Sequence, residues 1–106
     1  MFKVQPNPTF KADVTFAVPG GDEGKIKFIF KHKGRKALKT FFEDLGNTEK
    51  TRADHEALLE IVEGWEGVDQ KFSPDALELV LDNYPAAGIA IFETYNRSIF
   101  EAKQKN

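Results

Sequence analysis

The stretch FKADVTFAVPGGDEGKIKFIFKH, residues 10–32, decides the fold of the first third of this chain. Apolar and polar residues alternate in its first half, as in a strand with one buried face. PGGDEG, residues 19–24, then supplies turn residues, and KIKFIFKH resumes the alternation. The pattern predicts an antiparallel β-hairpin over about residues 10–32, with one face made by Phe10, Ala12, Val14, Phe16, Val18, Ile26, Phe28 and Phe30.

A lone two-stranded hairpin is marginally stable in water, so helices must cover its apolar face, and its open edges are free to recruit neighbours. After Gly34 the apolar period changes from two to about 3.6, which predicts helices over about residues 35–103. The first of these helices carries Leu38, Phe41, Phe42 and Leu45 and stops at Gly46 and Asn47.

Three more helices are predicted after residue 50. One runs from about Thr51 to Trp65, with TRAD as a capping box and an apolar stripe of Leu58, Ile61, Val62 and Trp65. The next begins with the Ser73 cap and Pro74 and buries Leu77, Val80, Leu81 and Tyr84. The last runs from Ala86 to about Lys103 and is apolar over so wide an arc that part of its surface must find a partner.

The length and composition fit one globular domain. A chain of 106 residues, 41% of them hydrophobic and 30% charged, can form a single core. We therefore expect an α+β domain over residues 1–106, an N-terminal hairpin packed against three to four helices, with residues 104–106 frayed. No apolar run approaches the roughly 18 to 20 residues of a membrane span, and no apolar stretch at the N-terminus resembles a signal peptide, so we expect a soluble protein without membrane contact.

Charge is divided unevenly between the two halves of the chain. Residues 1–53 hold eleven Lys and Arg against six Asp and Glu, a net charge of +5, whereas residues 54–106 hold four against eleven, a net charge of −7. Opposite charge on the two halves favours association with a charged partner or with further copies of the chain. Two solvated faces without a function are the alternative.

Residue patterns for catalysis are largely missing. The chain has no cysteine, and HEALLE at His55 begins like a zinc-protease motif but has Leu59 where the second histidine must stand. A solvated position on a helix is the expected place for His55. Carboxylates are scattered over helix exteriors, with nothing to raise the pKa of one for acid–base work. We expect a binding protein with no enzymatic activity, no metal and no cofactor.

The basic run KHKGRK, residues 31–36, raises the alternative of nucleic-acid binding. Clustered cations contact phosphates, and the cluster here consists of Lys31, Lys33, Arg35, Lys36 and Lys39. The run has no interleaved aromatic residues for base stacking, and the chain has a pI near 5.7. A solvated corner, or a contact with another subunit's acidic half, is therefore favoured over a nucleic-acid site.

GWEGVD, residues 64–69, holds the only tryptophan. Trp65 lies seven residues after Leu58, so it closes the same predicted helical stripe, and Gly67 can take the left-handed conformation that ends a helix. These positions indicate a plug in the core or at a helix junction. A partly exposed anchor for a partner stays as the alternative, since tryptophan suits sites with one apolar and one polar side.

Four segments make the chain resemble the tail assembly chaperones of long-tailed bacteriophages and prophages: NPTF (7–10), VPGGDEGKIKFIFKH (18–32), GWEGVD (64–69) and LVLDNYPAAGIAIFETY (79–95). The likeness extends over nearly the whole chain. It implies a factor in the host cytoplasm that binds the tape measure protein, keeps it soluble, promotes tail tube assembly and is absent from the finished virion. It also implies a longer form, made by a −1 ribosomal frameshift, that recruits the tail tube protein; QKN at residues 104–106 is compatible with a slippery sequence.

The resemblance and the residue pattern together suggest a multivalent binding protein. We expect a homo-oligomer that associates through hairpin edges and complementary charge. Core packing is the favoured role of each of six apolar and aromatic residues, and the same six are the candidates for contact with the partner: Trp65, Phe72, Tyr84, Ile91, Phe92 and Tyr95. Two other functions stay open: a structural tail or connector component of the virion, and a small nucleic-acid-binding regulator that uses the basic cluster.

Overall fold

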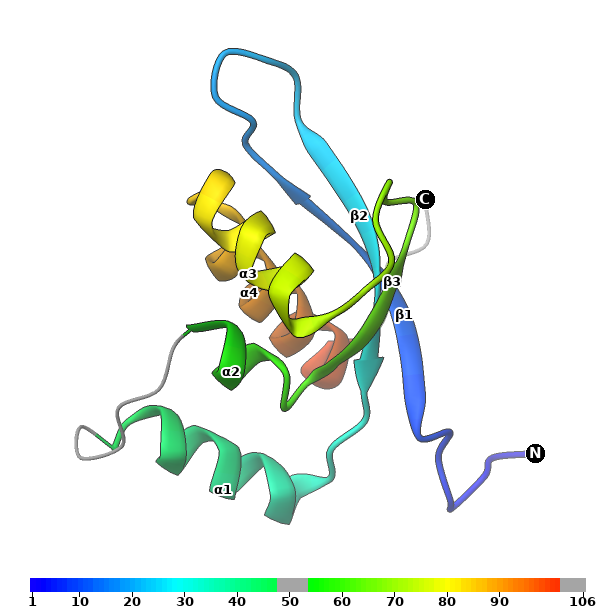
Figure 1. The fold of residues 1–106 in the computed structure, drawn as a ribbon. Coiled ribbons are helices and arrows are strands. Elements are labelled where there is room, and N and C mark those ends of the chain that lie inside the picture. The colour runs from blue at the N-terminus through cyan, green and yellow to red at the C-terminus, as the bar shows by residue number, and fades with distance from the viewer. Residues whose placement is uncertain (48–53, 102–106) are drawn as a thin grey trace.

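The computed structural model describes residues 1–47 and 54–101. Within these residues the chain forms a three-stranded antiparallel sheet with four helices packed against it, which confirms the predicted α+β class (Figure 1). The elements in chain order are β1 (Thr9–Phe16), β2 (Gly24–Lys31), α1 (Arg35–Leu45), α2 (Asp54–Leu58), β3 (Val62–Glu66), α3 (Pro74–Asn83) and α4 (Ala87–Phe100).

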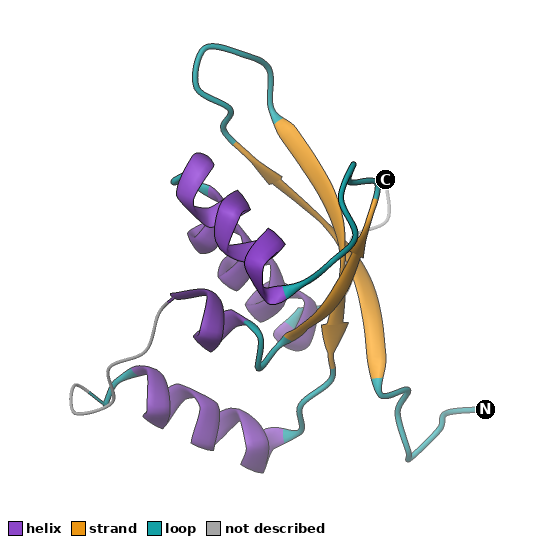
Figure 2. Cartoon of the chain, viewed as in Figure 1, coloured by secondary structure: helices purple, strands orange, loops and turns teal. Residues whose placement is uncertain are grey.

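The hairpin of β1 and β2 is confirmed, with Phe10 opposite Phe30 and Val14 opposite Ile26. Side chains of successive residues point to opposite faces of a strand, so the even-numbered residues of both strands share one face. That face is the core: Val14, Phe28 and Phe30 are fully buried there. The helices lie on this side of the sheet, and the hairpin turn extends beyond them (Figure 2).

The prediction of one helix from Thr51 to Trp65 is wrong. Its first three residues lie outside the described residues; helix α2 ends at Leu58, and Val62–Glu66 forms the third strand, paired with β2. Val62 lies opposite Phe30 while Gly64 lies opposite Ile29, so β3 has one extra residue at that point.

This bulge explains why the segment has a helical pattern. An extra residue lets side chains three apart face the same side of a sheet, where a regular strand would need a spacing of two. Val62 and Trp65 both reach the core in this way, at 1% and 9% exposure. A mid-helix Gly64 would in addition cost about 1 kcal/mol relative to alanine, whereas the open edge of β2 offers backbone partners.

Helices α3 and α4 begin and end close to the predicted positions. The Ser73 hydroxyl accepts a hydrogen bond of 3.0 Å from the Ala76 N–H, and Pro74 is the first helical residue, so the predicted cap is confirmed. Helix α4 runs over Ala87–Phe100; the predicted extension beyond residue 101 lies outside the described residues. Its packing against β1 places Ile91 and Tyr95 in the core.

Helix α1 has the predicted bounds and ends where Gly46 was expected to stop it. It packs through Leu38 and Phe41, which are 6% and 3% exposed, while Phe42 and Leu45 on the same helix stay exposed. No helix in the described parts of the chain is long and apolar enough to cross a membrane.

Candidate functional site

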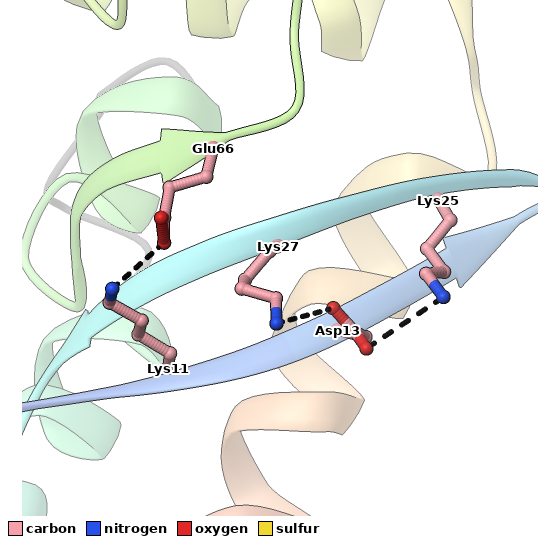
Figure 3. A network of polar contacts seen from close by, with 5 residues as sticks. All are labelled: Lys11, Asp13, Lys25, Lys27 and Glu66. Atoms are coloured by element: carbon pink, nitrogen blue, oxygen red, sulfur yellow. Dashed lines mark ion pairs between the residues drawn. The ribbon is translucent and has the colours of Figure 1, made fainter.

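The sheet face that points away from the helices is polar (Figure 3). The Lys11 ammonium lies 2.9 Å from a Glu66 carboxylate oxygen, and the Asp13 carboxylate lies 3.9 Å from each of the ammonium groups of Lys25 and Lys27. These side chains are between 44% and 65% exposed, so each pair adds little to stability. A face of this kind does not suit an apolar partner.

Trp65, from β3, lies in the core and not at a helix junction. Its indole N–H donates a hydrogen bond of 2.9 Å to the Gln70 carbonyl, and its ring meets Phe72 edge-on with centroids 5.1 Å apart. The Phe28 ring also meets the indole edge-on, with centroids 6.1 Å apart. Gly67, two residues later, has the positive φ predicted for it, 77°, but it ends a strand and not a helix.

Ile91 and Tyr95 are fully buried, so in this conformation both side chains pack in the core. Tyr95 donates a hydrogen bond of 2.9 Å to the carbonyl of Lys31, and burial raises the pKa of its phenol to about 12. Tyr84 is half-buried, with its ring 5.6 Å from that of Phe16. Their part in partner binding stays a prediction.

Phe92 is half-buried and joins α4 to α1. Its ring centroid lies 6.4 Å from that of Phe41 and 6.3 Å from that of Phe42, and the two α1 rings are themselves 5.7 Å apart. Phe41 is buried beneath this group, whereas Phe42 keeps 36% of its surface in solvent. The three rings therefore form the seam between the two helices, with one ring facing outward.

Further exposed apolar side chains lie on the same two helices. Leu45 is one helical turn beyond Phe42, and Ile89 is one turn before Phe92. Phe100 lies eleven residues after Ile89, three turns along the same side of α4, with the exposed Glu93 and Arg97 between them. Ile89 and Phe100 are each 67% exposed and Leu45 is 41% exposed. We call this surface the apolar strip; it consists of Phe42, Leu45, Ile89, Phe92 and Phe100.

Only Phe92 of the strip is among the six predicted contact residues. The sequence does signal a surplus of apolar residues on the last helix, and Ile89 and Phe100 account for that surplus. It does not signal which residues are left uncovered, because exposure depends on how α1 and α3 pack against α4. Phe42 and Leu45 have the spacing of core residues and are exposed because Leu38 and Phe41 take the inner positions.

The five residues of the predicted basic cluster do not share one environment in the structure. Lys31 donates a hydrogen bond of 3.1 Å to the Leu59 carbonyl, and the Lys33 ammonium lies 5.9 Å from the centroid of the Phe41 ring. Arg35, Lys36 and Lys39 are exposed on α1. Two of the five cations are thus engaged within the chain, and three face solvent.

The described residues contain no group of three or more histidine, cysteine or acidic side chains that could hold a metal ion. His55 is not solvated as expected: its side chain is only 15% exposed, and its Nε2 lies 3.5 Å from a Glu78 carboxylate oxygen. The packing of α2 against α3 covers this side chain.

Exposed apolar side chains gathered on two helices, opposite a polar sheet face, are typical of a protein that binds other proteins. Comparison with protein families identifies the class more closely. A family model described as phage tail assembly chaperone matches residues 1–106, and the chain belongs to this family. Comparisons with curated proteins and with solved structures found no match.

Proposed function

We propose that this protein binds the tape measure protein of a long-tailed phage in the host cytoplasm, keeps it soluble and promotes assembly of the tail tube around it. It acts by binding and not by catalysis, and it leaves before the virion is complete. Membership of the tail assembly chaperone family supports the general role. The tape measure protein is the partner implied by the resemblance of the sequence to these chaperones.

The observation that carries the proposal is the apolar strip. A long helical protein exposes apolar stripes that aggregate in water, and an amphipathic helix binds where a partner offers apolar side chains along a line. Phe42 and Phe92 supply adjacent rings from two helices, and Ile89 extends the line toward the start of α4. The strip therefore provides the chemistry that such a helix needs.

The strip is small, which suits a chaperone that must be displaced. Five side chains, two of them at 36% and 41% exposure, offer a modest area for each copy. High overall affinity then comes from many copies along one tape measure chain, because each bound copy raises the effective concentration of the next. A tail tube subunit can remove such copies one at a time, and a longer frameshifted form would bring that subunit to the complex.

Co-expression tests the proposal. The tape measure protein is expressed alone and together with this chain, and its soluble fraction is measured after centrifugation. We expect the tape measure protein to be largely insoluble alone, soluble with the chaperone, and recovered with it on affinity purification. No gain in solubility and no co-purification would refute the proposal.

Purified tails separate the proposal from the alternative of a structural virion component. Mass spectrometry of finished tails should detect the tube and tape measure proteins and not this chain. Stoichiometric amounts of this chain in washed tails would show that it is a tail component.

A further inference from the structure

Strand β1 has a free edge. Among residues 1–47 and 54–101 the strand order is β1-β2-β3, so only one side of β1 is paired there. The His32 N–H donates to the Pro8 carbonyl at 2.9 Å, and hydrogen-bonded pairs recur at every second residue of an antiparallel ladder. The even-numbered residues of β1 therefore bond to β2. The N–H and C=O groups of Thr9, Lys11, Asp13 and Thr15 point to the free edge.

The side chains of these same four residues lie on the polar face of the sheet. From residue 9 to residue 15 these side chains are Thr, Lys, Asp and Thr. A second strand that runs in the opposite direction, centred on Ala12, presents them in the order Thr, Asp, Lys, Thr. If two β1 edges pair antiparallel with Lys11 opposite Asp13 of the second copy, both charges meet an opposite charge, and each Thr9 meets a Thr15. Opposite charges and threonine pairs directly across from each other stabilise a sheet.

Other registers lose this match. Placing Lys11 opposite Lys11, or Asp13 opposite Asp13, puts like charges across from each other, which is destabilising. Wider shifts leave both charges without an opposite partner. A lysine on an edge strand ordinarily discourages pairing, so here Lys11 disfavours nearly every neighbour except one that presents an acid at the matching place.

The buried side of β1 is compatible with this register. Phe10 and Ala12 are only half-buried, although they lie on the core face of the strand. Pairing around Ala12 places the two smallest side chains of the strands at the two-fold axis and brings each Phe10 opposite Val14 of the other copy. Phe10 and Ala12 would then be covered, whereas Val14 is already buried in the single copy.

We infer that two copies of this protein pair through their β1 edges, antiparallel about Ala12, and form one continuous six-stranded sheet. Lys11 and Asp13 already form ion pairs within the chain, at 2.9 Å and 3.9 Å (Figure 3). Their side chains are 58% and 44% exposed, so these pairs are weak and both charges stay accessible to a second copy. Such an interface uses the same surface on both copies and closes at two. The inference rests on the proposed function in one respect: the dimer would present two apolar strips to one tape measure chain.

Charge exchange at two positions tests the register. By sedimentation equilibrium, Lys11→Asp and Asp13→Lys should each weaken dimerisation by at least about tenfold, because each creates two like-charge pairs across the axis. The double variant, with both residues exchanged, should dimerise like the wild type, and an equimolar mixture of the two single variants should form heterodimers. Lys36→Asp on α1 makes the same change of net charge as Lys11→Asp and should have no effect. A wild type that stays monomeric, or single variants that dimerise as well as the wild type, would overturn the inference.

Cross-linking tests the axis directly, since the chain has no cysteine of its own. Ala12→Cys places two thiols opposite each other at a non-hydrogen-bonded pair, where Cα atoms are about 4.5 Å apart, within reach of a disulfide. Thr15→Cys places the two thiols six residues apart along the strands, about 20 Å, and serves as the control. Oxidation should give a covalent dimer with Ala12→Cys and little with Thr15→Cys. Equal yields from both variants would exclude this axis.

The two proposals fail independently. If the β1 variants are monomeric and still keep the tape measure protein soluble, dimerisation stands and only its use in multivalent binding is lost. If the wild type dimerises as described and does not bind the tape measure protein, the edge pairing stands and the proposed function is wrong.

Discussion

The phenol of Tyr95 in α4 donates a hydrogen bond of 2.9 Å to the backbone carbonyl of Lys31, the last residue of β2. The two residues are 64 positions apart in the chain, so this bond joins the C-terminal helix to the end of the N-terminal hairpin. Tyr95 is fully buried, with the Phe30 and Phe10 rings 5.3 and 5.9 Å from its own. This contact adds to the packing of α4 against β1, which positions the helix and with it the apolar strip.

Tyr95→Phe should lower the free energy of unfolding by about 1 kcal/mol, the usual net value of one buried hydrogen bond, because the ring is kept and only the hydroxyl is lost. Urea unfolding followed by tryptophan fluorescence measures the change. Tyr84→Phe is the matched control, since Tyr84 is half-buried and its hydroxyl makes no hydrogen bond within the described residues; it should change stability by less. Equal effects would show that the bond to Lys31 contributes nothing of its own.

Alkaline pH should destabilise the protein through the same residue. Burial raises the pKa of Tyr95 to about 12, whereas a tyrosine in the unfolded chain titrates near 10. Below pH 10 the tyrosine is protonated in both the folded and the unfolded chain, and its contribution to the free energy of unfolding is complete. Between pH 10 and pH 12 only the unfolded chain releases the proton, so the free energy of unfolding falls by on the order of 1 kcal/mol per pH unit. Unfolding curves between pH 9 and pH 11.5 measure this slope. The slope should be smaller in Tyr95→Phe, and identical slopes would contradict the assignment.

Trp65→Ala should cost about 3 to 5 kcal/mol, because the side chain is 9% exposed and packs against Phe28 and Phe72. Trp65→Phe keeps an aromatic ring and loses the bond to Gln70, so its cost should be smaller. Circular dichroism with thermal unfolding compares the two variants. A Trp65→Ala protein with wild-type stability that no longer binds its partner would make Trp65 a recognition residue and not a core residue.

Gly67→Ala should destabilise the protein by about 1 kcal/mol, since residue 67 has a φ of 77°, a region that residues with a Cβ atom adopt at a cost. Gly46→Ala is the control: Gly46 has a φ of −84°, and an added Cβ would meet no atom closer than 3.7 Å. Denaturant midpoints of the two variants should differ clearly. Similar midpoints would show that the backbone after β3 relaxes without strain.

The hairpin and the helices α1, α3 and α4 could be predicted from the sequence because local signals agree with the final packing. Alternation places Val14 and Phe28 on one face, and the Ser73 cap with Pro74 starts α3 at the expected residue. Strand β3 could not be predicted in this way. Its bulge changes the spacing of Val62 and Trp65 to that of a helix, and the reason it is a strand is the open edge of β2, which lies far away in sequence.

The candidate site could be predicted only in outline. The excess of apolar residues on the last helix is visible in the sequence. Which of them are covered is not, because Ile91 is 0% exposed and Ile89 is 67% exposed according to the side of α4 on which each lies. Aromatic residues are the usual candidates for partner contacts, but Tyr95 and Trp65 are buried in the core of this protein. The smaller aliphatic residue Ile89 is more exposed than either of these two aromatic residues.

Binding by the apolar strip is tested most directly by comparing two exposed aliphatic residues on neighbouring helices. Ile89→Glu places a charge within the strip, whereas Leu79→Glu places one on α3, at a residue that is 50% exposed and lies outside the strip. The measurement is the soluble fraction of co-expressed tape measure protein, with circular dichroism to show that both variants are folded. We predict that Leu79→Glu keeps the tape measure protein soluble and that Ile89→Glu loses most of this effect. Equal solubility with both variants would contradict the assignment of the strip as the binding surface.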